Sequence, residues 1–172
     1  FASAYPSCQA FDPTFSYEVA VLIQDGIKRM YQDGEDIFYY ITLLNENYTH
    51  PEMPKGSEEG IKRGMYLFRG ADSGKAQVQL MGSGAILREV IAAADLLKDD
   101  FQIEANIWSI LGVNQLHREA LINEDWNRLH PEKLLKIIEL SEKVLGIERE
   151  VNLTINLLKL IVQVLEDDWY LL

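Results

Sequence analysis

A dense group of polar side chains occupies residues 45–50 of the chain. The residues are Asn45, Glu46, Asn47, Tyr48, Thr49 and His50. A carboxylate, a phenol and an imidazole beside two amides can move protons or orient a small polar substrate, so this loop is the first candidate for chemistry. The alternative is a surface loop whose asparagines form Asx turns with their own backbone.

The segments around this loop indicate how the fold places it. Residues 37–44 are apolar or β-branched throughout, which predicts a strand covered on both faces. A loop after such a strand lies at its carboxyl end, where open α/β sheets bind ligands. Residues 16–31 show helical spacing of apolar residues, with Thr14 or Ser16 as the start signal. Ser57 predicts the N-cap of a following helix.

The stretch RGADSGK, residues 69–75, is rich in turn-forming residues and predicts an interdomain linker. Beyond it the pattern predicts a strand at 76–81, a Gly-Ser-Gly turn at 82–84, a helix at 86–98 and a strand at 103–111. Strand, helix and strand of these lengths form a crossover with parallel strands. The turn could bind a phosphate, although a lone GSG is more often a packing turn.

Two predictions concern the last third of the chain. Asn114 is expected to cap a helix that Pro131 ends. Residues 132–172 carry leucine- and isoleucine-rich periodicity, which fits either alternating helices and strands or two long helices.

Composition excludes several classes of function. With 48% hydrophobic and 25% charged residues among 172, the chain reads as a soluble globular protein. A formal net charge of -11 argues against nucleic-acid binding. No segment is apolar enough to span a bilayer, so no membrane association is expected. The single cysteine, Cys8, indicates a reducing compartment.

No metal site is expected. The side chains of suitable chemistry in the helix predicted from Asn114 to Pro131 are His117, Glu119, Glu124 and His130. None of them forms a pair at a helical metal-ligand spacing such as HExxH, so structural histidines are favoured.

Four long motifs carry a resemblance to a known family. They are YEVAVLIQDGIKRMY, FYYITLLNENYTHPEMPKGSEEGIKRGMY, VQLMGSGAILREVIAAADLL and EDWNRLHPE. Together they resemble the homodimeric type of pyruvate dehydrogenase first component, an oxidoreductase that depends on thiamine diphosphate. The resemblance is dense from about residue 7 to residue 132, and the chain looks like an internal fragment of that protein.

The resemblance implies an α/β fragment of the thiamine-diphosphate-binding fold. Residues 1–70 would be the end of the pyrimidine-binding module. Residues 71–172 would begin the transketolase-type C-terminal domain, with parallel strands and flanking helices, and residues 133–172 diverge from the family.

The resemblance also implies a function. The family oxidatively decarboxylates pyruvate on thiamine diphosphate and Mg²⁺ and passes the acetyl unit to a lipoyl group on dihydrolipoamide acetyltransferase. It links glycolysis to acetyl-CoA as a cytoplasmic homodimer.

The site residues implied by the resemblance lie in the polar loop. Glu46 and His50 would be catalytic, and Asn47, Tyr48 and Thr49 would bind substrate. In the family a histidine follows the tyrosine directly. Here Thr49 takes that place and His50 comes one residue later, and a shift of one on an extended segment points a side chain to the opposite side.

The family's main cofactor-binding parts are expected to lie outside these residues. The Asp-Gly pairs at 25–26 and 33–34 lack the preceding glycine of the family's GDG motif. We therefore expect the isolated chain to be inactive and not to bind the cofactor. The alternative is a non-catalytic α/β interaction module derived from the same fold, with the apolar residues at 134–138 as part of a helical cap.

Overall fold

The structure, a computed structural model, describes residues 2–131. The chain divides into two compact units, Phe1–Gln115 and Leu116–Leu172. The predictions made for residues 132–172 lie outside the described residues. A short 3-10 helix (Ala2–Ala4) precedes the first strand.

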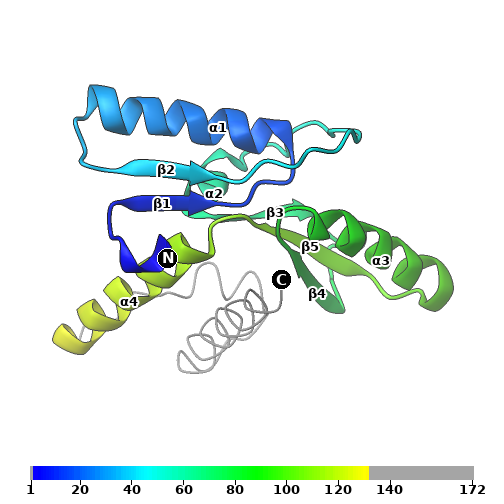
Figure 1. Cartoon of the computed structure of the whole chain (residues 1–172). Helices are drawn as coiled ribbons and strands as arrows, with labels where there is room; N and C mark the ends of the chain where they lie inside the picture. The colour runs from blue at the N-terminus through cyan, green and yellow to red at the C-terminus, as the bar shows by residue number, and fades with distance from the viewer. Residues whose placement is uncertain (1, 132–172) are drawn as a thin grey trace. The chain divides into compact units, whose positions relative to one another are not determined.

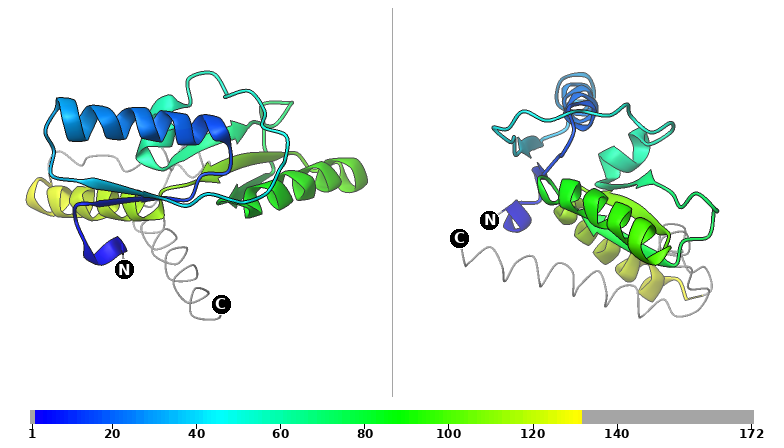
Figure 2. Two further views of the ribbon diagram at one scale, coloured as in Figure 1. Left: turned by 45° about the horizontal axis from the view of Figure 1, so that its top comes forward. Right: turned by 90° about the vertical axis from the view of Figure 1, so that its right-hand side faces the viewer.

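The first unit contains a two-stranded parallel sheet with a helix beside it. Strands β1 (Cys8–Phe11) and β2 (Phe38–Ile41) pair in parallel, with Cys8 opposite Phe38. The connection is helix α1 (Ser16–Ile27), which continues as a π-helical turn (Lys28–Gln32). The views of Figure 1 and Figure 2 both place α1 along the two strands. The predicted helix leading into a strand is confirmed.

Strand β2 is covered on one face, so the prediction of a strand buried on both faces was wrong. The Tyr39 side chain faces α1, where its ring lies over Gly26 and its hydroxyl donates to Asp25 at 2.5 Å. On the opposite face Phe38 and Tyr40 are 50% and 60% exposed. Three consecutive aromatic residues, Phe38 to Tyr40, followed by Ile41, hid the alternation that one-sided burial usually shows.

A three-stranded sheet forms the second half of this unit. Its strands are β3 (Met65–Arg69), β4 (Val78–Gly82) and β5 (Ala105–Ile110), in the order β3-β5-β4. β4 and β5 are parallel and are connected by α3 (Ile86–Phe101), while β3 is antiparallel to β5. Figure 2 shows α3 running along β4 and β5. The predicted crossover is confirmed, and the α/β fold class with it.

Strand β3 was not predicted. Helix α2 (Glu58–Arg63) starts after Ser57 as predicted and ends at Gly64, whose φ of 97° lies in the left-handed region that favours glycine. β3 begins directly afterwards. Residues 69–75 therefore connect two strands of one sheet, and the domain boundary near residue 70 stays a prediction.

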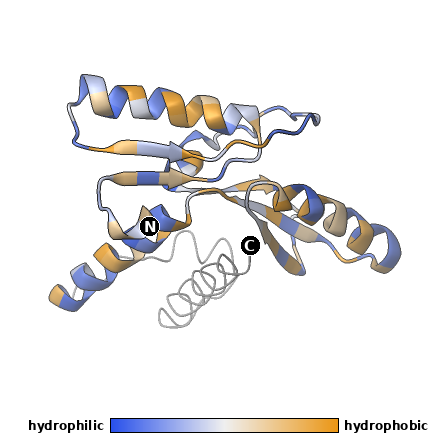
Figure 3. Ribbon diagram, in the orientation of Figure 1, coloured by the Kyte–Doolittle hydropathy of each residue, from blue (hydrophilic) through white to orange (hydrophobic). Residues whose placement is uncertain are grey.

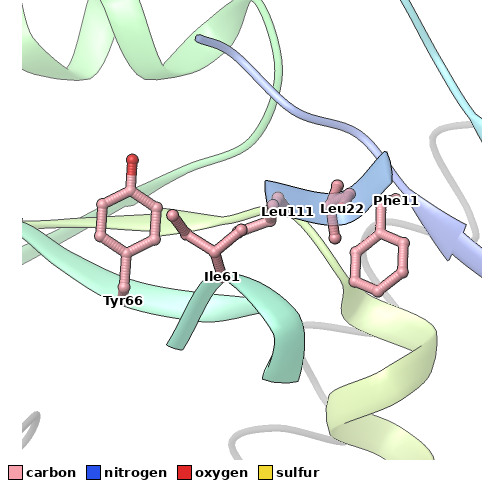
Figure 4. Close-up of a cluster of buried hydrophobic side chains, with 5 residues drawn as sticks. All are labelled: Phe11, Leu22, Ile61, Tyr66 and Leu111. Carbon is pink, nitrogen blue, oxygen red and sulfur yellow. The ribbon is translucent and has the colours of Figure 1, made fainter. Parts of the chain in front are cut away.

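Two buried clusters hold the first unit together. One comprises Phe11, Leu22, Ile61, Tyr66 and Leu111, which Figure 4 shows side by side. The other comprises Phe15, Leu87, Ala94 and Ile107. Each cluster draws on segments from both halves of the unit, so the two sheets share their apolar cores. Hydrophobic and hydrophilic residues alternate along α1 and α3, as expected of helices buried on one side (Figure 3).

Helix α4 (Val113–Leu129) begins in the first unit and continues into the second. The predicted cap Asn114 is its second residue, so that prediction was wrong by position, and the helix follows Gly112 instead. The helix ends before Pro131 as predicted. Near its end the rings of Trp126 and His130 stack with centroids 4.3 Å apart. Within residues 2–131, no helix has the length and apolar character needed to cross a membrane.

Candidate functional site

The polar loop at residues 45–50 leaves the carboxyl end of β2, as predicted, and lies largely in solvent. Tyr48 is half-buried, whereas Glu46, Asn47, Thr49 and His50 are exposed. The exposed groups are therefore accessible to a ligand from solvent.

Two side chains of the loop are held against the turn between β1 and α1. The Tyr48 hydroxyl donates a hydrogen bond to the carbonyl oxygen of Thr14. The backbone N–H of Ser16 donates to Nδ1 of His50 at 3.1 Å. The rings of Tyr48 and His50 lie 4.7 Å apart, and both meet the Phe15 ring edge to face. Residues 48 and 50 thus share one side of the extended loop.

Arg88, in the first turn of α3, approaches the loop from the second sheet. Its Nη1 lies 2.9 Å from Oε2 of Glu46, and its guanidinium carbon lies 4.5 Å from the centre of the Tyr48 ring. A guanidinium over an aromatic face is an attractive cation–π contact. Partial burial raises the pKa of Tyr48, and the positive charge of Arg88 opposes that shift.

Asp12 contacts residues that follow β2 in one sheet and β4 in the other. Its carboxylate accepts hydrogen bonds from Thr42, which follows β2, and from Ser83 at 3.1 Å, which follows β4. The backbone of Asp12 also accepts a hydrogen bond from the Gly84 N–H at 3.2 Å. Thr14 donates to the Gly84 carbonyl at 2.7 Å. The predicted Gly-Ser-Gly turn therefore packs against Asp12 and Thr14.

A second carboxylate, Glu18, is fully buried beneath this region. It accepts hydrogen bonds from the backbone N–H groups of Thr14 and Phe15 and from the hydroxyls of Tyr66 and Ser109. Burial raises the pKa of Tyr66, and the nearby negative charge of Glu18 adds to the shift.

The arrangement can bind a small polar molecule at the loop. Because Nδ1 of His50 accepts a hydrogen bond, the neutral ring carries its proton on Nε2, an assignment that follows from the hydrogen-bond geometry. An exposed Nε2–H can donate to a carbonyl or carboxylate oxygen. Asn47 and Thr49 offer further donors and acceptors on the opposite side of the same loop.

The structure gives no metal centre in the part of the chain that it describes. Among residues 2–131, no three His, Cys, Asp or Glu side chains are grouped so that they could hold a metal ion. His117 and His130 lie on or just after α4, and the Nδ1 of His130 lies 2.9 Å from the Trp126 carbonyl oxygen.

Three residues of this site were missed by sequence reasoning. Glu18 had a signal, since it falls on the same helical stripe as the buried Phe15 and Leu22, where a carboxylate is unusual. Asp12 and Arg88 had none, because their partners come from segments distant in the sequence.

Comparison with known families gives two matches along the chain. Residues 1–51, which include the polar loop, match the model of the pyruvate dehydrogenase E1 component middle domain. Residues 64–158 match the model of the transketolase-like TK C-terminal domain.

Curated relatives agree with these matches. The pyruvate dehydrogenase E1 component of Pseudomonas aeruginosa is 54% identical over 131 residues, which is 76% of this chain and 15% of that protein. The protein of the same name from Cupriavidus necator is 53% identical over 133 residues, and the one from Escherichia coli is 46% identical over 127. The chain thus spans about 15% of the length of the curated relatives it matches.

Among solved structures, a transketolase variant from Pichia stipitis matches with a TM-score of 0.49 and 18% identity. The match covers 64% of this chain and 15% of that one.

Proposed function

We propose, from the premise that this chain belongs to the pyruvate dehydrogenase E1 component family of transketolase-like proteins, that it supplies the substrate-facing loop of such an enzyme. The enzyme would oxidatively decarboxylate pyruvate with thiamine diphosphate and transfer the acetyl unit to a lipoyl group. The 172 residues alone would not complete this reaction.

One observation carries the proposal. The loop at residues 45–50 lies inside the segment matched by the middle-domain model, and it presents exposed polar groups at the carboxyl end of a strand. This is where α/β sheets place their ligands. Pyruvate offers a carboxylate and a carbonyl oxygen, and both accept hydrogen bonds.

The loop residues take separate roles in this proposal. The Nε2–H of His50 donates to an oxygen of pyruvate, and the Glu46 carboxylate holds or moves a proton beside it. Asn47 and Thr49 bind the substrate through their exposed polar groups. Tyr48 fixes the loop through its hydrogen bond to Thr14 and its ring contact with His50.

In this family, thiamine diphosphate with Mg²⁺ supplies the chemistry of the decarboxylation. The Asp-Gly pairs at residues 25–26 and 33–34 lack the preceding glycine of the GDG motif by which the family is expected to hold magnesium. We therefore assign none of the described residues to the cofactor. Its binding groups are proposed to come from other parts of an E1 protein.

The partners follow from the same family assignment. They are pyruvate, the lipoyl-bearing dihydrolipoamide acetyltransferase and a second E1 subunit, with no nucleic acid. The proposed location is the cytoplasm, where the reaction would link glycolysis to acetyl-CoA.

Calorimetry of cofactor binding tests the proposal. Thiamine diphosphate with Mg²⁺ is titrated into this chain and into a chimera, in which these residues replace the matching segment of the Pseudomonas aeruginosa relative. We expect no heat from the chain alone and a Kd for the chimera within about tenfold of the parent value. A folded chimera that does not bind the cofactor would remove the enzyme assignment.

A further inference from the structure

We propose that Glu18 is a positioning residue that sets the place of Tyr48 and His50. It acts through the turn at residues 14–16, and it does not touch a ligand itself. Its consequence for catalysis rests on the proposed function, whereas the placement of the loop does not.

Glu18 is fully buried, and both oxygens of its carboxylate are used. Oε2 accepts from the N–H groups of Thr14 and Phe15, at 2.5 and 2.8 Å. Oε1 accepts from the hydroxyls of Tyr66 and Ser109, at 2.6 and 2.8 Å. Four donors for one carboxylate compensate the loss of water that burial imposes.

The two oxygens of this carboxylate face different parts of the molecule. Tyr66 and Ser109 belong to β3 and β5, the paired strands of the second sheet. Thr14 and Phe15 belong to the turn that leads into α1. The carboxylate therefore fixes the turn relative to the second sheet, which an apolar side chain of the same size could not do.

The same turn is the surface against which the loop rests. The carbonyl of Thr14 accepts the Tyr48 hydroxyl, and the N–H of Ser16 donates to His50. Ser16 begins α1, where a backbone N–H has no partner within the helix. A displacement of the turn would therefore move the acceptor of Tyr48 and the donor of His50 together.

Substitutions of Glu18 can distinguish an effect on the position of the loop from an effect on the stability of the fold. Glu18→Met keeps the side-chain length but offers the turn no acceptor. Glu18→Gln is expected to rescue, because its amide oxygen can face the turn while its NH₂ group donates to the hydroxyls of Tyr66 and Ser109. Ser109→Ala is the matched control, since it removes one donor on the sheet side and leaves the turn side unchanged.

Two signals in the full 172-residue chain report the loop directly. Nitrogen-15 NMR measures the fraction of His50 with its proton on Nε2, in a chain with three histidines, and hydrogen exchange measures protection of the Ser16 amide. In Glu18→Met we expect mixed tautomers and exchange of the Ser16 amide faster by about tenfold. In Glu18→Gln and Ser109→Ala both signals should stay as in the parent chain.

The proposal is overturned if Glu18→Met leaves the His50 tautomer and the exchange of the Ser16 amide unchanged. It is also overturned if Ser109→Ala, at the same loss of stability as Glu18→Met, changes these two signals as much as Glu18→Met does. Should Glu18→Met not fold, Glu18→Asp replaces it. The aspartate is one methylene too short to reach both sets of donors, so loss of the His50 signal supports the proposal and its retention overturns it. None of these signals needs pyruvate or cofactor, so the result stands apart from the calorimetry.

Discussion

Three tyrosine hydroxyls of the first unit are withdrawn from water and hydrogen-bonded. Tyr66 donates to Glu18 and lies 2.6 Å from the Tyr17 hydroxyl, while Tyr39 donates to Asp25. Burial is the largest cause that raises each pKa, to about 12 for Tyr39. The neighbouring carboxylates further disfavour the ionised phenols.

Stability is therefore expected to fall at alkaline pH. The folded-state pKa of each group exceeds the unfolded value near 10, so the folded chain holds these protons more tightly. Their stabilisation is complete below about pH 10 and is lost as the pH rises through the folded pKa. Each tyrosine should contribute a slope of about 1.4 kcal/mol per pH unit to the free energy of unfolding above pH 10.

Tyr66→Phe tests this expectation by urea unfolding between pH 8.5 and 11.5. The variant should lose about 1–2 kcal/mol of stability at neutral pH, because Glu18 loses a donor. Above pH 10 its free energy of unfolding should fall less steeply with pH, by about the contribution of one tyrosine. Tyr40→Phe, at a ring that is 60% exposed, is the control and should keep the parent slope. Equal slopes in parent chain and Tyr66→Phe would contradict the account.

At the level of single residues, sequence reasoning identified the loop at residues 45–50 but not the residues that hold it in place. The polar residues 45–50 were recognisable because their types are unusual together after an apolar strand. Arg88 contacts Glu46 of the loop, which is 42 positions away in the sequence. Asp12 contacts Ser83, which is 71 positions away. Contacts of that separation leave no local pattern.

The turn between β4 and α3 contacts Asp12, which follows β1 of the other sheet. Gly84 has a φ of 48°, and a Cβ there would overlap the carboxylate of Asp12. Gly74 also has a positive φ, of 73°, but a Cβ there would meet no atom within 4 Å. The two glycines share backbone strain and differ in crowding.

Gly84→Ala should therefore destabilise the chain more than Gly74→Ala. We expect a loss of about 1 kcal/mol at Gly74 from the left-handed backbone alone. At Gly84 the displacement of Asp12 should raise the loss to about 3 kcal/mol or more. Thermal and urea unfolding of both variants measure the difference. Equal losses would show that the contact with Asp12 contributes nothing.

At the level of elements, periodicity and turn signals predicted α1, α3, β4 and β5. Strand β1 was missed because four residues are too short for alternation to register, and β3 because it starts directly after a helix. The exposure of Phe38 and Tyr40 was missed because a run of aromatic residues in β2 looks the same whether one face or both are covered.

At the level of the whole molecule, the first unit exposes several large apolar side chains. On α1 and its extension these are Ile23, Ile27 and Tyr31, and on or after β2 they are Phe38, Tyr40 and Leu43. Each is at least half exposed. Phe38 and Tyr40 lie together on the face of β2 opposite to α1, and this surface suits contact with further protein.

We expect the purified chain to self-associate through this surface. Sedimentation velocity at rising concentration should show an increasing average mass in about 0.15 M salt, where the net charge is screened. Replacing Phe38 and Tyr40 by lysine should restore a monomer, whereas Leu96→Lys, on α3, should not. A clean monomer of the parent chain would favour the alternative, a self-contained interaction module.

The central claim is that these residues form the substrate-facing part of a pyruvate dehydrogenase E1 component. The most direct test is pyruvate turnover by the chimera that carries them in the Pseudomonas aeruginosa relative, with thiamine diphosphate and Mg²⁺ present. We predict a kcat/KM for pyruvate within about tenfold of the parent enzyme, and a loss of about a hundredfold when His50 is replaced by alanine. A folded chimera that binds the cofactor but consumes pyruvate only at background rate would contradict the claim.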